Sequence, residues 1–454
     1  MFILPILLFH KQEMTRANRI LLCALAILAI TGAYCVGMSF PVTFIALIVL
    51  LAFLYGWFGK PAILANVMLL VVSSGFVVVV AEVVLRATLT EYLYYRPHEM
   101  FIQSWPRFPE VARYKANASV SRGTFGDLAA MSEDENLRET RSIDFITDSF
   151  GFRNKPLDEE PVYDILLLGD SFTVGNGTTQ ESTWATLLSS RYNLQVYNLA
   201  IPGSPWQSYV NLAMEMERLD IHPGTTIILA IFSGNDLDES YGPTEITDLP
   251  LNDTIETVRV ALSTYRNRSV IMQLKDRVDR ASNSSDHSDV VLVKEALGVG
   301  RILFYKPYVE RKERSREDIL KHRNYSYLEQ TLSSINDLAI RHSANFKIIL
   351  IPTKAEIYSW VVDGAAPWST GTEPSGFSTV LRELSEADEI EYLDIKPFLL
   401  AHAKDEYEGS NQLLWWLDDT HWNVNGHSMV ADVVYNTFLK PSKVLPNQSL
   451  KQTR

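Results

Sequence analysis

The sequence predicts an α/β protein with an open, doubly wound parallel sheet, preceded by a membrane region. Two observations carry this prediction. From residue 161 onward, short apolar stretches alternate with helical ones, which is typical of parallel strands that are covered by helices on both faces. Residues 1–90 instead contain three nearly uncharged apolar runs, each close to the roughly 20 residues needed to cross a bilayer.

The three apolar runs and the basic residues beside them predict how the chain crosses the membrane. Lys11, Arg16 and Arg19 precede the first run, and Lys60 lies in the second connection. Because basic residues favour the cytoplasmic side, we expect the N-terminus and the second connection in the cytoplasm. Transmembrane helices over 20–38, 40–58 and 61–85 then place the rest of the chain outside. The predicted location is the cell membrane, multi-pass, with the C-terminal domain extracytoplasmic, and periplasmic in a Gram-negative cell.

Changes in composition divide the chain into four parts. We expect a membrane region over 1–90, an extracytoplasmic connecting segment over 91–160, an α/β domain over 161–440 and a disordered tail over 441–454. A long interval near 240–345 is predicted to be a helical insert that covers the site. The expected sheet has about five strands, at 163–168, 195–201, 225–232, 347–352 and 391–395.

Charge and cysteine content argue against several classes of function. The formal net charge is −13 and no basic stripe is present, so a nucleic-acid partner is not expected. Both cysteines, Cys23 and Cys35, lie in the first apolar run. The α/β domain therefore uses no disulfide, thiolate metal site or cysteine nucleophile, and we expect no cofactor.

Residues that suit acyl transfer follow successive strand candidates. A Gly-Asp-Ser turn at 169–171 follows the first strand, and such a small-residue turn exposes the Ser171 hydroxyl. Gly203 follows the second strand, Asn235 follows the third, and an acidic loop that contains His421 follows the fifth. Because ligands bind beyond the carboxyl ends of parallel strands, we expect these residues to converge on one rim of the sheet.

Each of these residues has a role in a serine-nucleophile mechanism. Ser171 supplies the hydroxyl, His421 takes its proton, and an acid just before the histidine orients the imidazole. The backbone N–H groups of Ser171 and Gly203 and the side-chain amide of Asn235 form the oxyanion hole. Taken singly, Gly203 and Asn235 are more often turn residues, so their order along the chain carries the interpretation.

A metal site is the alternative use of the same rim. Its ligands would be Asp170, Asp236, Asp418 and His421. No tight ligand cluster such as His-Glu-x-x-His accompanies them, and we therefore expect no metal.

The ordered motifs resemble those of the SGNH or GDSL hydrolase superfamily. Four blocks match in order: Gly-Asp-Ser at 169–171, Gly203, Gly-Asn-Asp at 234–236 and Asp-Asp-Thr-His at 418–421. The resemblance covers about residues 144–440. It implies a flavodoxin-like three-layer α/β/α sandwich and a Ser-His-Asp ester hydrolase or acyltransferase. No Gly-x-Ser-x-Gly elbow surrounds Ser171, which argues against the α/β-hydrolase family.

The resemblance leaves the acid of the triad open between two neighbours. The general Asp-x-x-His spacing of the superfamily selects Asp418. The Asp-Thr-His-Trp sequence is similar to the periplasmic alginate O-acetyltransferase branch, in which the acid lies two residues before the histidine, and it selects Asp419. Residues 351–358 are also similar to a segment of that branch. Of the two aspartates we favour Asp418.

Motifs and topology together predict a membrane-anchored, extracytoplasmic serine esterase or O-acyltransferase. The expected substrates are O-acyl groups, acetyl above all, on a cell-surface or exported polysaccharide. Two other interpretations are a lipid-directed esterase, suggested by the aromatic stretch at 92–107, and a non-catalytic glycan-binding scaffold in a polysaccharide modification or export complex. The expected partners are the glycan, the lipid bilayer and a membrane protein that delivers the acyl donor.

Overall fold

The computed structural model describes residues 95–105, 108–132, 134–156, 161–219, 221–240 and 290–440, with six scattered residues between 77 and 85. Apart from those six, the predicted membrane region lies outside the described residues. So do both cysteines, the first part of the insert and the tail. Among the residues that are described, no helix has both the length and the apolar character needed to cross a bilayer.

A five-stranded parallel sheet forms the centre of the described part, as the sequence predicts. Its strands lie in the order β11-β10-β7-β5-β6, which is the flavodoxin-like arrangement. Each strand matches a predicted one to within a few residues. The strands are β5 (Ile165–Gly169), β6 (Val196–Asn198), β7 (Thr226–Phe232), β10 (Asn345–Ile351) and β11 (Glu391–Asp394).

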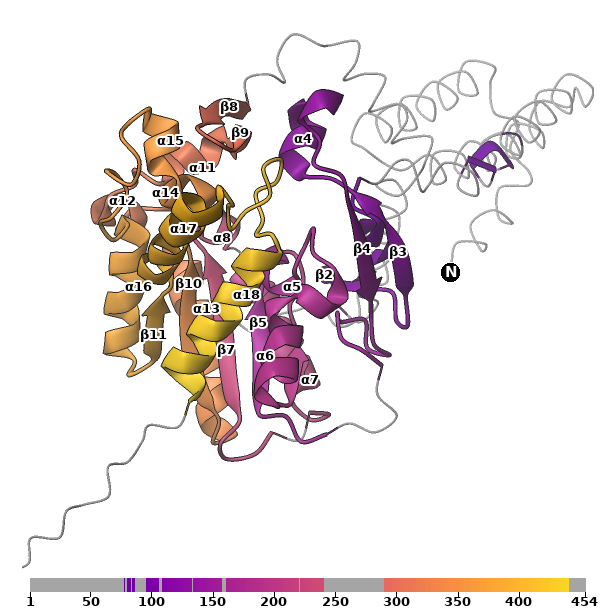
Figure 1. The fold of residues 1–454 in the computed structure, drawn as a ribbon. Coiled ribbons are helices and arrows are strands. Elements are labelled where there is room, and N and C mark those ends of the chain that lie inside the picture. The colour runs from indigo at the N-terminus through magenta and orange to yellow at the C-terminus, as the bar shows by residue number, and fades with distance from the viewer. Residues whose placement is uncertain are drawn as a thin grey trace, which may run out of the picture. The chain divides into compact units, whose positions relative to one another are not determined.

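Helices cover both faces of this sheet, so the fold has three layers (Figure 1). Along β5, Ile165 and Leu167 belong to the hydrophobic cluster on one face, while Leu166 and Leu168 belong to the cluster on the other. The first cluster includes α6 (Trp184–Tyr192), α17 (Lys396–Ser410) and α18 (Val424–Val434). The second includes α7 (Pro205–Glu215), α13 (Tyr325–Arg341) and α16 (Gly376–Ala387).

The described part of the insert is not wholly helical, which corrects the sequence prediction. It starts with an antiparallel hairpin of β8 (Val291–Ala296) and β9 (Gly300–Tyr305). From residue 292 to residue 296, more exposed and less exposed side chains alternate along β8, which is the pattern of a half-buried strand. Three helices follow: α11 (Lys306–Arg311), α12 (Arg316–Leu320) and α13.

Residues 95–156, here called the N-terminal segment, pack against the α/β core. The segment contains η1 (Pro97–Phe101), the pair β1 (Ile102–Trp105) and β2 (Phe108–Tyr114), the pair β3 (Ser119–Thr124) and β4 (Arg141–Ile146), α4 (Asp127–Ser132) and η2 (Glu135–Leu137). Its buried rings Tyr114, Phe145 and Phe152 join the same hydrophobic cluster as α7 and α13. The segment and the sheet therefore share one core.

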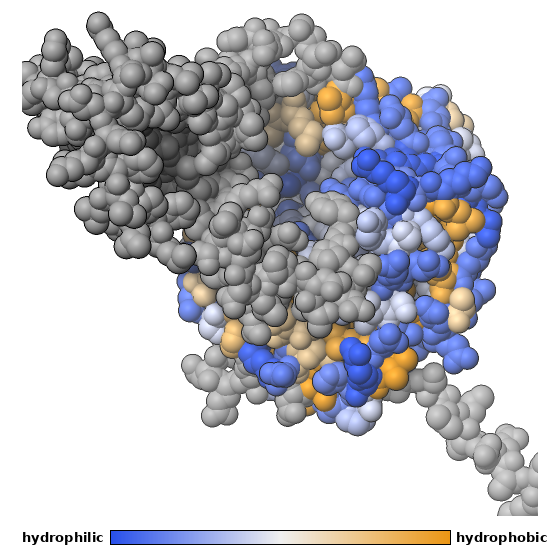
Figure 2. Space-filling view, turned by 180° about the vertical axis from the view of Figure 1, so that it is seen from behind, coloured by the Kyte–Doolittle hydropathy of each residue, from blue (hydrophilic) through white to orange (hydrophobic). Residues whose placement is uncertain are grey.

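The surface seen from behind is mostly hydrophilic where its residues are described. Figure 2 shows hydrophobic residues there in small separate patches among hydrophilic ones. Patches of that size are normal on a folded domain. The search for a functional site therefore turns to the polar groups at the carboxyl ends of the strands.

Candidate active site

Ser171 is the first residue of α5 (Ser171–Val174) and lies just beyond the carboxyl end of β5. Asp170 caps this short helix, because its side chain accepts a hydrogen bond from the Phe172 backbone N–H at 2.9 Å. Gly169 has φ +148°, and a Cβ there would lie 2.9 Å from the carbonyl oxygen of Ala230. The tight turn therefore requires glycine at 169, and it leaves Ser171 partly exposed.

His421 connects the hydroxyl of Ser171 to a carboxylate. His421 Nε2 lies 2.7 Å from Ser171 Oγ, and His421 Nδ1 lies 2.8 Å from Asp419 Oδ1. The backbone N–H of His421 also donates to Asp419 Oδ1 at 3.1 Å, so one short turn fixes acid and imidazole together. Hydroxyl, imidazole and carboxylate thus have the contacts that a serine nucleophile needs.

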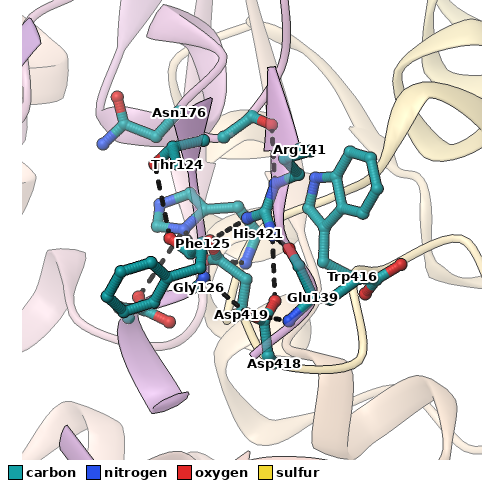
Figure 3. A network of polar contacts seen from close by, with 12 residues as sticks. Thr124, Phe125, Gly126, Glu139, Arg141, Asn176, Trp416, Asp418, Asp419 and His421 are labelled. Atoms are coloured by element: carbon teal, nitrogen blue, oxygen red, sulfur yellow. Dashed lines mark hydrogen bonds and ion pairs between the residues drawn. The ribbon is translucent and has the colours of Figure 1, made fainter. Parts of the chain in front are cut away.

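Asp418 contacts the N-terminal segment and not the imidazole. Its Oδ2 accepts hydrogen bonds from the backbone N–H groups of Gly126 and Glu139, at 2.7 and 2.8 Å. Its Oδ1 accepts one from Arg141 Nη1 at 2.9 Å (Figure 3). These contacts correct the prediction that Asp418 is the acid that orients His421. Its oxygens hold the N-terminal segment in place, whereas Asp419 lies against His421.

Two arginines of the N-terminal segment neutralise Asp419. Arg96 Nη2 donates to its Oδ1 at 2.7 Å, and Arg141 Nη2 donates to its Oδ2 at 2.6 Å. Burial by itself would raise the pKa of Asp419, but Arg96, the hydrogen bond from His421 and Arg141 together hold that pKa well below its usual range. Asp419 is therefore an anion at neutral pH although it is fully buried.

A buried lysine holds the loop that carries Asp419. Lys354 begins α14 (Lys354–Ile357), just beyond β10. Its Nζ donates to the carbonyl oxygens of Trp416, Leu417 and Asp419 at 2.7, 2.9 and 3.2 Å. Burial lowers the pKa of Lys354 to about 8, although nearby carboxylates oppose this. The lysine thus positions the loop through backbone contacts and does not touch His421.

The predicted oxyanion-hole residues follow the two strands that flank β5. Gly203 follows β6 and Asn235 follows β7, and the sheet order places these strands on either side of β5. Gly203 has φ +154°, a conformation that glycine adopts readily. Asn235 stands at the N-terminus of α8 (Asp236–Glu239) without capping it, and its buried Oδ1 has no hydrogen-bond partner among the described residues. Its amide is therefore not committed to the helix.

The four residues of the alternative metal site do not form one ligand set. Asp170 and Asp236 are each bonded within their own turn, Asp236 by accepting from the Phe232 backbone N–H at 2.8 Å. Among the described residues, the acidic and imidazole groups close enough to share a cation are those of Asp127, Asp419 and His421. Arg96 Nη2 already lies 2.7 Å from the Asp419 carboxylate and 3.2 Å from that of Asp127, so a guanidinium provides the positive charge there.

A third arginine of the N-terminal segment supports the loop after the nucleophile. Arg153 is 2% exposed and donates to the carbonyl oxygens of Val174, Gly175 and Thr178. Its other hydrogen bonds go to Gln180 Oε1 and the carbonyl oxygen of Asp144, so within the described residues neutral oxygens and no carboxylate satisfy its donors. Nothing in the sequence pattern predicts a site role for these three arginines or for Asp127. No short motif surrounds them, and their partners lie far along the chain.

A known family matches the part of the chain that contains Ser171 and His421. The model of the GDSL-like lipase/acylhydrolase family matches residues 167–429, which is more than half of the chain. No curated protein matches the chain. The N-terminal segment lies outside the matched region.

The solved structures that match this chain are distant from it in sequence. TesA is 13% identical, with 61% of this chain and 98% of that chain covered and a TM-score of 0.31. The acetyl xylan esterase AlAXEase is 11% identical, with 60% and 99% covered and a TM-score of 0.31. A lipolytic G-D-S-L protein from Veillonella parvula is 13% identical, with 61% and 98% covered and a TM-score of 0.30.

Proposed function

The chain belongs to the GDSL-like lipase/acylhydrolase family and acts on ester bonds, and we propose that it is a membrane-anchored, extracytoplasmic serine esterase or O-acyltransferase. Its proposed substrates are O-acetyl groups of a cell-surface or exported polysaccharide. One observation carries the proposal: Ser171 Oγ, the His421 imidazole and the Asp419 carboxylate are in contact, at 2.7 and 2.8 Å.

In the first half of the proposed reaction, the ester carbonyl carbon is attacked by Ser171 Oγ. His421 Nε2 takes the hydroxyl proton as the new C–O bond forms, and Asp419 balances the charge of the imidazolium. The developing oxyanion is held by the backbone N–H groups of Ser171 and Gly203 and the amide of Asn235. Collapse of this intermediate breaks the bond to the sugar oxygen, which leaves as an alcohol with the proton from His421.

In the second half, the acyl group leaves Ser171. Water, or an acceptor hydroxyl in the case of transfer, gives its proton to His421 Nε2 and attacks the acyl carbon. Breaking the bond to Ser171 Oγ returns the proton to the serine. Hydrolysis and transfer are both included in the proposal, because Ser171 and His421 have the same roles in each.

Sequence features support the remaining parts of the proposal. The three apolar runs at 20–38, 40–58 and 61–85, with basic residues on the predicted cytoplasmic side, favour a multi-pass anchor. The Asp-Thr-His-Trp sequence at 419–422 favours the acetyltransferase-like branch. A domain held outside the membrane would meet polysaccharide at the cell surface.

The proposal is tested by the hydrolysis of p-nitrophenyl acetate by the full-length protein in detergent. We expect Ser171→Ala to lower kcat by at least about 10³-fold, because the nucleophile is lost. Ser190→Ala, an exposed serine on α6, is the matched control and should keep wild-type kcat. Mass spectrometry of the quenched wild-type protein should locate an acetyl adduct on Ser171, and activity that survives Ser171→Ala would contradict the proposal.

The choice of substrate is tested separately. We expect the wild-type protein to turn over acetylated polysaccharide faster than lysophospholipid at equal ester concentration. Faster turnover of lysophospholipid would favour a lipid-directed esterase. Wild-type polysaccharide acylation in a chromosomal Ser171→Ala strain, lost on deletion of the gene, would favour a non-catalytic scaffold.

A further inference from the structure

A row of aromatic rings connects His421 to helix α11 of the insert. The centre of the Phe172 ring lies 4.7 Å from that of His421 and 4.3 Å from that of Phe232. Phe232 in turn lies 5.3 Å from Tyr308 of α11. Phe172 and Phe232 are fully buried, whereas Tyr308 is only half-buried. Tyr308 is therefore the member of this row that a substrate can reach.

Arg311 holds α11 against the turn that carries Asn235. It lies one helical turn after Tyr308, and its Nη1 donates to the carbonyl oxygen of Gly234 at 2.5 Å. Its Nε also lies 3.3 Å from a carboxylate oxygen of Asp238. These two contacts lie on either side of Asn235 in the chain, so α11 is fixed beside the proposed oxyanion hole.

Tyr305 connects Tyr308 to the surroundings of His421. The centres of the two tyrosine rings are 4.8 Å apart, and Tyr305 packs against the hydrophobic cluster that contains Leu128 of α4. Helix α4 begins with Asp127, whose Oδ2 lies 3.7 Å from His421 Nδ1. Tyr308 thus lies between the turn after β7 and the helix beside the imidazole.

The hydroxyl of Tyr308 forms no hydrogen bond with any residue that the structure describes. Burial raises the pKa of Tyr308 well above its usual value, and the carboxylates of Asp127, Asp170 and Glu239 raise it further. The phenol therefore keeps its hydrogen at neutral pH and can donate it. Because polar groups inside proteins are normally hydrogen-bonded, a hydroxyl that the protein leaves unused beside its site can serve a ligand.

The half of the ester that reaches Tyr308 is the alcohol. In the proposed reaction the alcohol oxygen takes its proton from His421 Nε2, so this half of the substrate lies on the imidazole side of Ser171. Ring contacts connect Tyr308 to the imidazole, and the phenol therefore lies on the same side.

The surroundings of Tyr308 suit a hydroxyl-bearing alcohol better than a hydrocarbon chain. The Arg311 guanidinium lies 5.6 Å from the centre of the Tyr308 ring, and three carboxylates act on its hydroxyl. A hydrocarbon chain would remove these groups from water without offering them a hydrogen bond, which costs free energy. The hydroxyls of a sugar or polyol replace the hydrogen bonds of that water.

Resting on the proposed function, in which Ser171 and His421 act on an ester, we infer that Tyr308 is a substrate-binding residue that selects esters of hydroxyl-bearing alcohols, such as sugars and polyols. Its hydroxyl donates a hydrogen bond to an oxygen of the alcohol half, and its ring forms the wall beside that half. In transfer the acceptor occupies the same place, because it replaces the alcohol. Tyr308 lies on the insert, far in the sequence from the motifs that carry the nucleophile and the base.

The test compares two acetate esters that differ only in hydroxyl groups, glycerol 1-acetate and propyl acetate. The full-length protein in detergent hydrolyses each ester, and the released acetate gives kcat/KM. We expect the wild type to prefer glycerol 1-acetate. Tyr308→Phe removes only the hydroxyl, so kcat/KM for glycerol 1-acetate should fall about 5- to 10-fold, whereas kcat/KM for propyl acetate should stay within about twofold.

Two further variants accompany this comparison. Tyr327→Phe removes an exposed phenol of α13 in the same insert and is the matched control, which should keep the wild-type preference. Tyr308→Met serves if Tyr308→Phe does not fold, because methionine keeps an apolar side chain against Phe232, and it should lose the preference in the same way. Denaturant titration should show no loss of unfolding free energy in Tyr308→Phe, because its hydroxyl bonds to no described residue.

The outcomes separate this inference from the proposed function. An unchanged ratio of the two kcat/KM values in Tyr308→Phe overturns the inference, and so does a wild-type preference for propyl acetate. An equal loss for both esters also overturns it and indicates a structural role. Acetate release that survives Ser171→Ala would instead overturn the proposed function.

Discussion

The sheet rim and the N-terminal segment build one site in different ways. On the sheet rim, defined as the turns after β5, β6 and β7, each residue is placed by the strand just before it. Arg96, Asp127 and Arg141 of the N-terminal segment instead reach the loop at 418–421 across 323, 293 and 278 residues. A short motif therefore locates the nucleophile Ser171. The contacts that surround Asp419 come from residues far away in the sequence and cannot be found from a motif.

The largest expected effect separates the two neighbouring aspartates. Asp419→Asn puts an amide beside His421 Nδ1, and we expect kcat for p-nitrophenyl acetate to fall on the order of 10³- to 10⁴-fold, because an amide there favours the wrong tautomer. Asp418→Asn keeps an oxygen for the backbone N–H groups of Gly126 and Glu139, so kcat should fall less than about 10-fold. Equal losses of kcat in the two variants would contradict this division of roles between Asp418 and Asp419.

The parts of the fold that could be predicted from the sequence depend on local signals. Apolar runs of strand length and the turns that follow them predict the five parallel strands, and the order of these turns predicts Ser171, Gly203, Asn235 and His421. The structure confirms the strands and brings Ser171 and His421 into contact. The strands are predicted from residues that are close together in the sequence, and the site residues need in addition only the order of their turns along the chain.

The choice between Asp418 and Asp419 could not be made from local signals. Both carboxylates precede His421 on the same turn, and their roles are separated by what lies opposite them. Asp418 meets backbone N–H groups of the N-terminal segment, whereas Asp419 meets the imidazole and two guanidiniums. Buried arginines look like ordinary surface charges in a sequence, because nothing nearby shows that they will be paired.

The second largest effect tests how the N-terminal segment supports the rim. Arg153→Met leaves the carbonyl oxygens of Val174, Gly175 and Thr178 buried without this donor, and we expect the free energy of unfolding to fall by about 4 kcal/mol. Denaturant titration of the full-length protein measures this change. Arg138→Ala is the control, because its ion pair with Glu135 is exposed and is worth at most about 1 kcal/mol. Equal losses for both variants would show that Arg153 does not support the rim.

A smaller effect tests the rim alone. Asn235→Ala removes the proposed side-chain donor of the oxyanion hole, and we expect kcat to fall on the order of 10²-fold with KM little changed. The fold should keep its stability, because Asn235 does not cap α8. Asn436→Ala, an exposed asparagine near the C-terminus of the domain, is the control. An unchanged kcat in Asn235→Ala would remove this residue from the proposed mechanism.

Buried carboxylates show the difference between the two regions most directly. Asp419 lies beside two arginines of the N-terminal segment, which hold its pKa well below the usual range. No guanidinium of the described residues pairs with Asp170 on the rim, and burial raises the pKa of Asp170 to about 6, although the Phe172 backbone N–H opposes this. The same degree of burial thus has opposite consequences, and the presence of a cation decides the direction.

The smallest expected effect follows from this contrast. The pKa of Asp170 is raised from 3.8 to about 6 on folding, so between these values the folded state holds more protons than the unfolded state. The free energy of unfolding therefore falls as the pH rises through this window, by about 2 kcal/mol for this group. Asp170→Asn keeps an oxygen for the Phe172 N–H but does not titrate, so its unfolding free energy should fall less between pH 4 and pH 6. Denaturant titrations at both pH values measure the difference, with the exposed Asp164→Asn just before β5 as the control. A pH dependence in Asp170→Asn identical to that of the wild type would mean that another group stabilises the Asp170 anion, and the contrast between the two regions would then not rest on the arginines.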